Sequence, residues 1–414
     1  MRGSAIDLES RFTGLFTGLA DIGRHADGRG CTRLAWTAED RAARDWFTDA
    51  AQQRDLDVET DRNGNLWAWW GGRDADVVVT GSHLDTVLAG GAYDGALGVV
   101  SALAAVDGLH DRGVRIGARS LAIVAFADEE GARFNTPTFG SGLMTGRRDP
   151  ADVLGRRDVD GVSVAEAMAA AGVDPEQAGA DPDRLARVRA VVELHVEQGR
   201  HLVDVGQPLA LCTGVWPRGR WRARIDGEAN HAGTTGLDDR ADPMLVLATA
   251  IEAARACADQ RDCRATIGRV DIAPNGASGV ASRVVAYLDA RAADDDATLD
   301  GFVDDWWTAV RDRAGAHGCQ VRLDCDSRGA AVAFDGEIRG RLRRRLEQRY
   351  PGIPEIASAA GHDAAVLADH VPAAMLFVRN PTGVSHSPAE HAETADCLAG
   401  VVALTDVLEE LLGA

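Results

Sequence analysis

Several stretches of the sequence are nearly continuous runs of Val, Ile, Leu and Ala, without the alternation of an exposed strand. They are residues 76–80, 120–128 and 373–380. Strands with apolar side chains on both faces are typical of parallel sheets covered by helices on both sides. Helical patterns separate or follow these runs, at residues 37–54, 95–113 and 394–412. The sequence therefore predicts an α/β fold with a mainly parallel, doubly covered sheet.

A different pattern occupies the middle of the chain. Residues 218–227 and 282–292 alternate polar and apolar side chains, as antiparallel strands with one exposed face do. Helical runs accompany them at residues 242–260 and 297–318. This content is typical of a small α+β sandwich inserted into the larger domain. We predict an inserted α+β domain at residues 214–330 and a catalytic α/β domain formed by residues 1–213 and 331–414.

Composition excludes several classes of function. The 414-residue chain has a formal net charge of −20, and all 44 of its Lys+Arg residues are arginine. Nucleic acids and anionic membranes require basic patches, so neither is an expected partner. The absence of lysine excludes Schiff-base and phosphate-loop lysine chemistry. Seven scattered cysteines without a CxxC pair, and no apolar N-terminal stretch, predict a cytoplasmic protein with reduced thiols.

Side chains that bind metals follow four of the apolar runs. In open α/β sheets, ligands collect beyond the carboxyl ends of the strands. The sequence places "GSHLDT" after one run, "DEEGARF" after the next, a histidine in "VRAVVELHV", and "GVSHSP" after "AMLFVRN". We expect one edge of the sheet to gather His83, Asp85, Asp94, Glu129, Glu130, His195 and His386.

Each of these residues alone has an ordinary explanation. A histidine at a strand end is commonly just hydrogen-bonded, paired acids such as Glu129 and Glu130 are commonly solvated, and Asp94 fits a turn. Four strand ends with such residues favour a metal site instead, because imidazole nitrogen and carboxylate oxygen suit zinc and manganese. Two ions that share a carboxylate suit hydrolysis, since they activate a water and polarise a carbonyl.

Longer motifs, spread in order over nearly the whole chain, resemble those of one family. They are "GSHLDTVLAGGAYDGALGV", "FADEEGARF", "GSGLMTG", "ELHVEQG", "GEANHAGTT", "DPM", "LDAR", "GHDA" and "FVRNPTGVSHSPAEH". The sequence resembles the dinuclear-metal amidohydrolases of the M20 peptidase clan, in the branch of allantoate amidohydrolases and N-carbamoyl-L-amino-acid hydrolases. The resemblance implies an aminopeptidase-like fold and a homodimer, with the inserted domain as lid and dimer interface.

The resemblance also implies two divalent metal ions and their ligands. Manganese and zinc are the expected ions, and cobalt and nickel also suit such sites. Asp94 would bridge the two ions, His83 and His195 would complete one site, and Glu130 and His386 the other. Peptidase branches of the clan carry a carboxylate where this chain has His195.

Further roles follow from the same resemblance. Glu129 would be the general base that takes a proton from the attacking water, and Asp85 would hold the second ring nitrogen of His83. His231, in "GEANHAGTT", would come from the partner subunit and polarise the scissile carbonyl. Arg291 would clamp a substrate carboxylate, and Gln198 would contact the ureido group.

Other positions have less defined roles. His362, in "GHDA", would lie near the substrate or serve as a structural loop histidine. The family pattern reads like "PNxxNxIPxRV", and this chain departs from it with Ser278 for an Asn and Ala281 for a Pro. In the family this Asn helps the arginine to bind the substrate carboxylate. Here either Asn275 or water takes its place, or the substrate is smaller or differently polar at its carboxylate end. Arg240 and Asp242 are expected to brace the lid.

The expected reaction is hydrolysis of a ureido (N-carbamoyl) C–N bond in a small molecule. Allantoate is the first candidate substrate, with ureidoglycine, ammonia and carbon dioxide as products. N-carbamoyl-L-amino acids come second, and a specialised ureido or amide substrate third. The rival interpretations are a metalloaminopeptidase, which His195 and Arg291 disfavour, and a non-catalytic binding homologue, which would have lost a ligand or the base.

Overall fold

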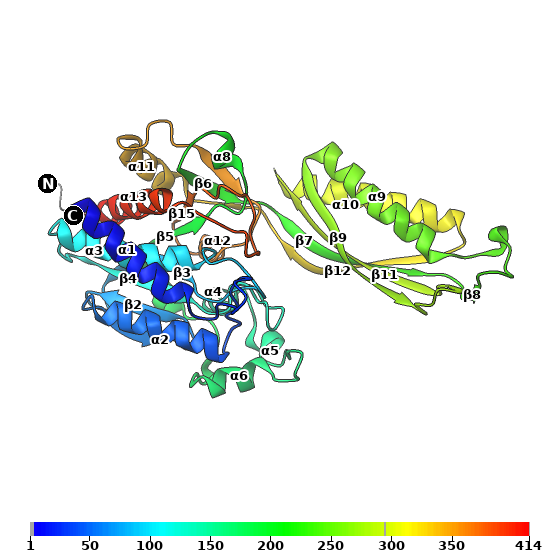
Figure 1. Cartoon of the computed structure of the whole chain (residues 1–414), viewed down its shortest axis with the longest axis horizontal. Coiled ribbons are helices and arrows are strands. Elements are labelled where there is room, and N and C mark those ends of the chain that lie inside the picture. The colour runs from blue at the N-terminus through cyan, green and yellow to red at the C-terminus, as the bar shows by residue number, and fades with distance from the viewer. Residues whose placement is uncertain (1–3, 294, 414) are drawn as a thin grey trace. The chain divides into compact units, whose positions relative to one another are not determined.

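The computed structural model describes residues 4–293 and 295–413, and the chain forms two compact units (Figure 1). Unit 1 comprises Met1–Thr213, Ala333–Ile356 and Gly361–Ala414, and unit 2 comprises Gly214–Val332 and Ala357–Ala360. The predicted boundaries place the segment Ala357–Ala360 in the catalytic domain, whereas the structure groups it with unit 2. It joins unit 2 because the oxygen of Ser358 accepts from Trp216 N at 2.8 Å and that of Ala359 from Arg291 Nη1 at 2.7 Å.

Unit 1 is built on a sheet that has nine strands within the described residues, in the order β1-β2-β4-β3-β5-β15-β6-β13, with β14 paired to β6. Strands β4, β3, β5 and β15 are mutually parallel, and the neighbours on either side are antiparallel. The strands are β1 (Asp57–Thr60), β2 (Leu66–Trp70), β3 (Asp76–His83), β4 (Arg119–Phe126), β5 (Val188–Val196), β6 (Leu209–Val215), β13 (Val332–Ala333), β14 (Glu355–Ser358) and β15 (Ala373–Val378). The predicted α/β fold is confirmed.

Four of the longer described helices of unit 1 pack against this sheet, and α1 (Ser4–Ala20) packs on one of them, α3 (Ala96–Asp111). The other helices that contact the sheet are α2 (Ala38–Gln52), α11 (Gly336–Glu347) and α13 (Thr394–Leu412). The hydroxyl of Thr37 caps α2 by accepting from Asp40 N, as its acidic first turn suggests. Short helical turns connect the rest: α4 (Phe139–Met144), α5 (Pro150–Val153), α6 (Val164–Ala170), η1 (Pro175–Gln177), α7 (Pro182–Leu185), α8 (His201–Asp204) and α12 (Asp363–Leu367).

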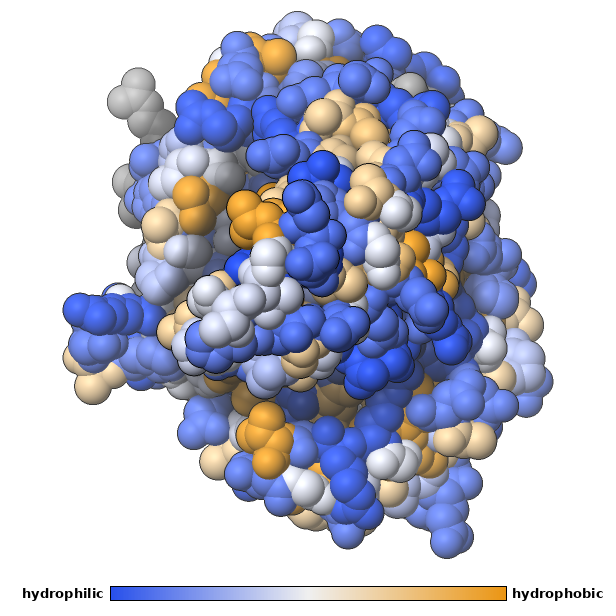
Figure 2. All heavy atoms as spheres, turned by 90° about the vertical axis from the view of Figure 1, so that its right-hand side faces the viewer, coloured by the Kyte–Doolittle hydropathy of each residue, from blue (hydrophilic) through white to orange (hydrophobic). Residues whose placement is uncertain are grey.

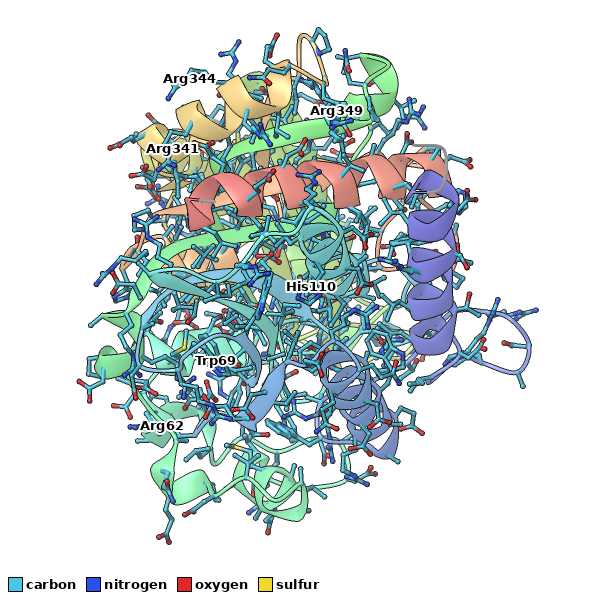
Figure 3. The ribbon with its side chains drawn as sticks, turned by 90° about the vertical axis from the view of Figure 1, so that its left-hand side faces the viewer. Arg62, Trp69, His110, Arg341, Arg344 and Arg349 are labelled. Carbon is cyan, nitrogen blue, oxygen red and sulfur yellow. The ribbon has the colours of Figure 1, made fainter. Side chains whose placement is uncertain are left out.

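Helix α11 is rich in arginine, and carboxylates of α13 pair with part of this charge. Arg341 pairs with Glu410 at 3.2 Å and Arg345 with Glu409 at 2.9 Å, both on α13. Figure 3 shows Arg341 and Arg344 on α11, with Arg349 beyond its end. Since α13 supplies carboxylates to this helix, the arginine run is a packing feature of an acidic chain.

Unit 2 is a four-stranded antiparallel sheet, in the order β12-β7-β11-β9, with two helices. Its core includes Trp306 and Phe302, which are fully buried against the sheet. The elements are β7 (Arg218–Asp226), β8 (Asn230–His231), η2 (Leu237–Asp239), α9 (Pro243–Arg261), β9 (Cys263–Ala273), β10 (Gly279–Val280), β11 (Arg283–Ala292), α10 (Asp296–Ala316) and β12 (Gln320–Gly329).

On the face in Figure 2, apolar residues form small groups separated by polar ones. No described helix combines the length and the apolar character that a membrane crossing requires. All seven cysteines are free in the structure.

Candidate metal centre

The parallel strands of unit 1 end at one edge of the sheet, and there the predicted ligands meet. His83 is the last residue of β3, His195 lies near the end of β5, and Glu130 follows β4. Ligand atoms of His83, Asp94 and His195 all lie within 4.8 Å of one another. The same holds for Asp94, Glu130 and His386. The two groups share Asp94, so the structure brings all five predicted ligands together.

Glycines allow the chain to fold closely around this cluster. Gly81 has φ +136°, and a Cβ there would lie 1.9 Å from the oxygen of Val124. Gly95 has φ +65°, and a Cβ there would lie 2.4 Å from the His83 ring. Since side chains at these positions would be strained and would clash, glycine is required directly after Asp94 and within β3.

The first group has two imidazoles facing one carboxylate. Nε2 of His195 lies 3.1 Å from Asp94 Oδ1, and Nε2 of His83 lies 3.5 Å from the same oxygen. Nδ1 of His195 lies 2.9 Å from the carbonyl oxygen of Val196, and Nδ1 of His83 lies 3.1 Å from that of Asp85. A carbonyl oxygen only accepts, so Nδ1 carries the proton in each neutral ring. Both Nε2 atoms therefore face the space next to Asp94, and that of His195 accepts from Gly95 N at 3.3 Å.

Asp85 meets the second ring nitrogen of His83 through its backbone oxygen. Its backbone oxygen is the nearer partner of His83, whereas its carboxylate oxygen lies 3.7 Å from Nδ1. The carboxylate instead accepts from the backbone N–H groups of Glu129, at 3.1 Å, and Glu130, at 3.0 Å. Two N–H donors satisfy a buried carboxylate better than one distant ring. Asp85 thereby fixes the loop that carries Glu129 and Glu130.

The second group is more open. Nε2 of His386 lies 3.3 Å from Glu130 Oε2 and 3.5 Å from Asp94 Oδ2. The His386 side chain is 48% exposed, whereas that of His195 is 1% exposed. Glu129 is buried, and its Oε2 lies 4.0 Å from Nε2 of His83. The cluster is therefore closed on the His83 and His195 side and reachable from solvent at His386.

Titration of the cluster reflects its excess of buried carboxyl groups. Burial, followed by the charge of Asp94, raises the pKa of Glu130 to about 8, and burial also raises that of Glu129. Burial lowers the pKa of His195, but Asp94 outweighs it and raises the value to about 9. Protons thus compensate the negative charge, and divalent cations would displace them on binding. The nitrogen and oxygen donors fit such ions.

Two other predicted residues of unit 1 adjoin this cluster. Nε2 of Gln198 donates to Asp94 Oδ2 at 2.8 Å, and its buried Oε1 accepts no hydrogen bond among the described residues. The ring of His362 is buried and lies 4.6 Å from that of His195 in an edge-to-face arrangement. Gln198 and His362 therefore flank the two ends of the Asp94–His195 pair.

The predicted residues of unit 2 form a separate group. His231 is exposed on β8, which pairs with β10, so that His231 faces Gly279. The oxygen of Ser278 accepts from Ala232 N at 3.0 Å, and Asn275 is exposed on the same loop. Arg240 Nη2 donates to the oxygen of Ala232 at 2.6 Å and so braces the His231 loop, whereas Asp242 caps α9.

The ring of His231 has a defined tautomer. Its Nδ1 accepts from the backbone N–H groups of Gly233, at 3.1 Å, and Thr234, at 3.2 Å. The proton of the neutral ring therefore lies on Nε2, which can donate to a carbonyl oxygen. Arg291 is partly exposed, and its Nε donates to Asp289 Oδ1 at 3.2 Å.

Residues that the sequence patterns did not single out also contact the centre. Ser385 Oγ lies 3.0 Å from Asp94 Oδ2 and 2.9 Å from Glu390 Oε2. Glu193 Oε1 accepts from Ser82 Oγ at 2.7 Å, and its Oε2 accepts from Ala364 N at 2.9 Å. These residues lie within motifs that the sequence analysis quoted. Their spacing does not distinguish them from ordinary polar residues of a loop, so the sequence could not identify them as contacts of the centre.

Comparison with known proteins agrees with this architecture. Residues 72–410 match the family described as peptidase family M20/M25/M40. A crystal structure of an amidase of the hydantoinase/carbamoylase family from Burkholderia multivorans superposes with a TM-score of 0.84 and 30% identity, covering 97% of each chain.

Curated relatives span nearly the full length. An N-carbamoyl-L-amino acid amidohydrolase of Geobacillus stearothermophilus is 36% identical over 95% of this chain and 96% of its own. An allantoate amidohydrolase of Bacillus subtilis (strain 168) is 33% identical over 99% of this chain and 100% of its own. The chain belongs to peptidase family M20/M25/M40.

Proposed function

We propose that this protein is a metal-dependent hydrolase that cleaves a ureido (N-carbamoyl) C–N bond in a small molecule. The observation that carries the proposal is the pair of ligand groups that share Asp94, with Glu129 beside them. Relatives at 36% and 33% identity are named for amide-bond hydrolysis of N-carbamoyl amino acids and of allantoate. The family is generally metal-dependent, which agrees with this donor set.

The five clustered side chains would hold two divalent ions, manganese or zinc, with cobalt or nickel as alternatives. His83, His195 and Asp94 would serve one ion, and Glu130, His386 and Asp94 the other. When bound, such ions activate water and polarise a carbonyl. The carbonyl oxygens at Nδ1 of His83 and His195 keep both rings oriented for this task.

Glu129 would move the proton in this reaction. Its backbone N–H is fixed by Asp85, and its buried carboxyl lies on the His83 side of the cluster. Burial and neighbouring acids raise the pKa of Glu129, and a base with a raised pKa accepts a proton more readily. It would take a proton from water and deliver it to the leaving nitrogen.

His231 would stabilise negative charge on the substrate oxygen. Its Nε2–H is the donor that remains once Nδ1 accepts from Gly233 and Thr234. Arg291 would bind a substrate carboxylate, with Asn275 and Ser278 at the same end of the substrate, and Gln198 would contact the ureido group. We propose that the protein forms a homodimer through unit 2, and that His231 of one subunit contributes to the active site of the other.

Allantoate remains the first candidate substrate, and an allantoate amidohydrolase is among the relatives, at 33% identity. N-carbamoyl-L-amino acids are the second, and the relative at 36% identity favours them specifically. Ser278 offers a short hydroxyl, so a specialised ureido or amide substrate is the third. The first two of these substrates share the ureido group and differ in the substituent on its nitrogen. The residues of unit 2 would contact that substituent.

The test is release of ammonia by the metal-loaded protein, with allantoate and with a set of N-carbamoyl-L-amino acids. Removal of a general base typically costs about 10²–10⁴-fold in rate, so Glu129→Gln should lose at least about 100-fold in kcat and still bind metal. Glu393→Gln, an exposed change elsewhere in unit 1, is the matched control. Binding of a ureide without any turnover would support the non-catalytic alternative and contradict the proposal.

A further inference from the structure

Glu390 contacts the backbone that carries Asp94. Its Oε1 accepts from the N–H of Tyr93 and from the N–H of Asp94, both at 2.9 Å. The two partners are close to 300 residues away in sequence, with separations of 297 and 296 positions. Glu390 is 5% exposed. A single oxygen of Glu390 therefore fixes the backbone at Tyr93 and Asp94, and Asp94 is the residue that the two ligand groups share.

Ser385 continues this contact to the side chain of Asp94. Its Oγ lies between the two carboxyl groups, 2.9 Å from Glu390 Oε2 and 3.0 Å from Asp94 Oδ2. A hydroxyl carries one hydrogen, so Ser385 donates to Asp94 Oδ2 while its oxygen stays within hydrogen-bond distance of Glu390 Oε2. Glu390 thus contacts Asp94 at the backbone through Oε1, and Ser385 contacts its side chain. Both groups come from the loop that also presents His386.

The loop before Asp94 is shaped around Glu390. A Cβ at Gly91 would lie 2.2 Å from Glu390 Oε1 and 2.4 Å from its Cδ. Gly91 has no positive φ, so its backbone would accept any residue, and only the space for Glu390 excludes a side chain. A carboxyl beside a second buried carboxyl is electrostatically unfavourable. The N–H groups of Tyr93 and Asp94 offset this cost by donating to Glu390, so the acid is held here by its contacts with the Asp94 backbone.

We propose that Glu390 and Ser385 act as a clamp that positions Asp94, so that its two oxygens face the two ligand groups. This inference rests on the proposed function only in that Asp94 binds both ions. The clamp residues touch neither ion nor substrate in this account, so they are positioning residues. Their contribution is hydrogen-bond geometry, which an amide at position 390 would largely preserve.

The experiment titrates Co²⁺ into metal-stripped full-length protein and records visible absorption and the number of ions bound per chain. Partners of metal ligands typically contribute about 10–100-fold in metal affinity. Ser385→Ala and Glu390→Ala should therefore weaken binding of at least one ion by about 10–100-fold and change the cobalt spectrum. Glu390→Gln should retain an affinity close to wild type, and Glu393→Gln serves as the matched control.

Several outcomes would overturn the clamp. They are wild-type affinity and spectrum in Ser385→Ala, or equal losses in Glu390→Gln and Glu390→Ala. The melting temperature of each metal-free variant shows whether it folds, and the small Ser385→Ala change tests the clamp even where Glu390→Ala does not fold. Wild-type protein that binds two ions but releases no ammonia would overturn the proposed function and leave the clamp intact.

Discussion

Asp40 illustrates how a single buried carboxyl group shapes stability away from the centre. It lies on the first turn of α2, is 5% exposed, and accepts from Trp36 N at 2.8 Å. Burial raises its pKa from 3.8 to about 6, although Arg44 and the Trp36 N–H act in the opposite direction. Between these two values the folded protein holds a proton that the unfolded chain has released. The free energy of unfolding therefore falls as pH rises from about 4 to about 6.

Asp40→Asn should remove this loss, because an amide keeps the acceptor for Trp36 and cannot ionise. The difference between the two pKa values corresponds to about 3 kcal/mol. Relative to wild type, the variant should therefore gain up to about 3 kcal/mol between pH 4 and pH 7. Urea unfolding across this range measures it, with exposed Asp49→Asn on the same helix as the control. A constant difference between Asp40→Asn and wild type would contradict the argument.

At the scale of elements, α3 is buried on almost all sides, and its contacts explain a glycine within it. A Cβ at Gly98 would lie 2.3 Å from the oxygen of Leu194 on β5 and 2.8 Å from Ser82 Cβ on β3. Gly98 therefore sets the distance between α3 and the two strands that carry His83 and His195.

Gly98→Ala should reduce the free energy of unfolding by about 1–3 kcal/mol, as overpacking in a core typically does. Gly14, on α1, has no atom within 4 Å of a Cβ. Gly14→Ala should stabilise the protein by about 0.5–1 kcal/mol, because glycine within a helix loses more backbone entropy than alanine. Chemical denaturation compares the two. Equal effects of both substitutions would show that α3 tolerates the added atom.

Elements were predictable where apolar patterns were long. The runs at 76–80 and 373–380 became β3 and β15, and the helix at 394–412 became α13 with the same bounds. The clustering of His83 with His195 followed from strand ends at one edge of a parallel sheet. The contacts of Asp85, Ser385 and Glu390 did not follow, because they depend on loop geometry and on residues hundreds of positions apart.

At the scale of the whole molecule, unit 2 presents an exposed apolar stripe on α9. Met244, Leu245 and Ile251 are 39%, 42% and 48% exposed. Their spacing places them along one side of the helix, and such a stripe is typical of an interface. It supports the proposed homodimer, in which His231 would reach the site of the other subunit.

Sedimentation velocity should accordingly give twice the chain mass of 43.7 kDa. The double substitution Leu245→Glu with Ile251→Glu should yield monomers, since it places charges on the apolar stripe. Val159→Glu, at a fully exposed position of unit 1, is the control and should leave the dimer intact. A wild-type monomer at micromolar concentration would contradict the dimer and the trans role of His231.

The proposed activity requires two cations held around Asp94 by His83, His195, Glu130 and His386. Anomalous X-ray diffraction from crystals grown with zinc or manganese, recorded at the absorption edge of that metal, tests it most directly. We expect two anomalous peaks on either side of the Asp94 carboxylate, about 3.5–4 Å apart as in other two-metal hydrolases. Absence of any peak within bonding distance of Asp94 and His195 would contradict it.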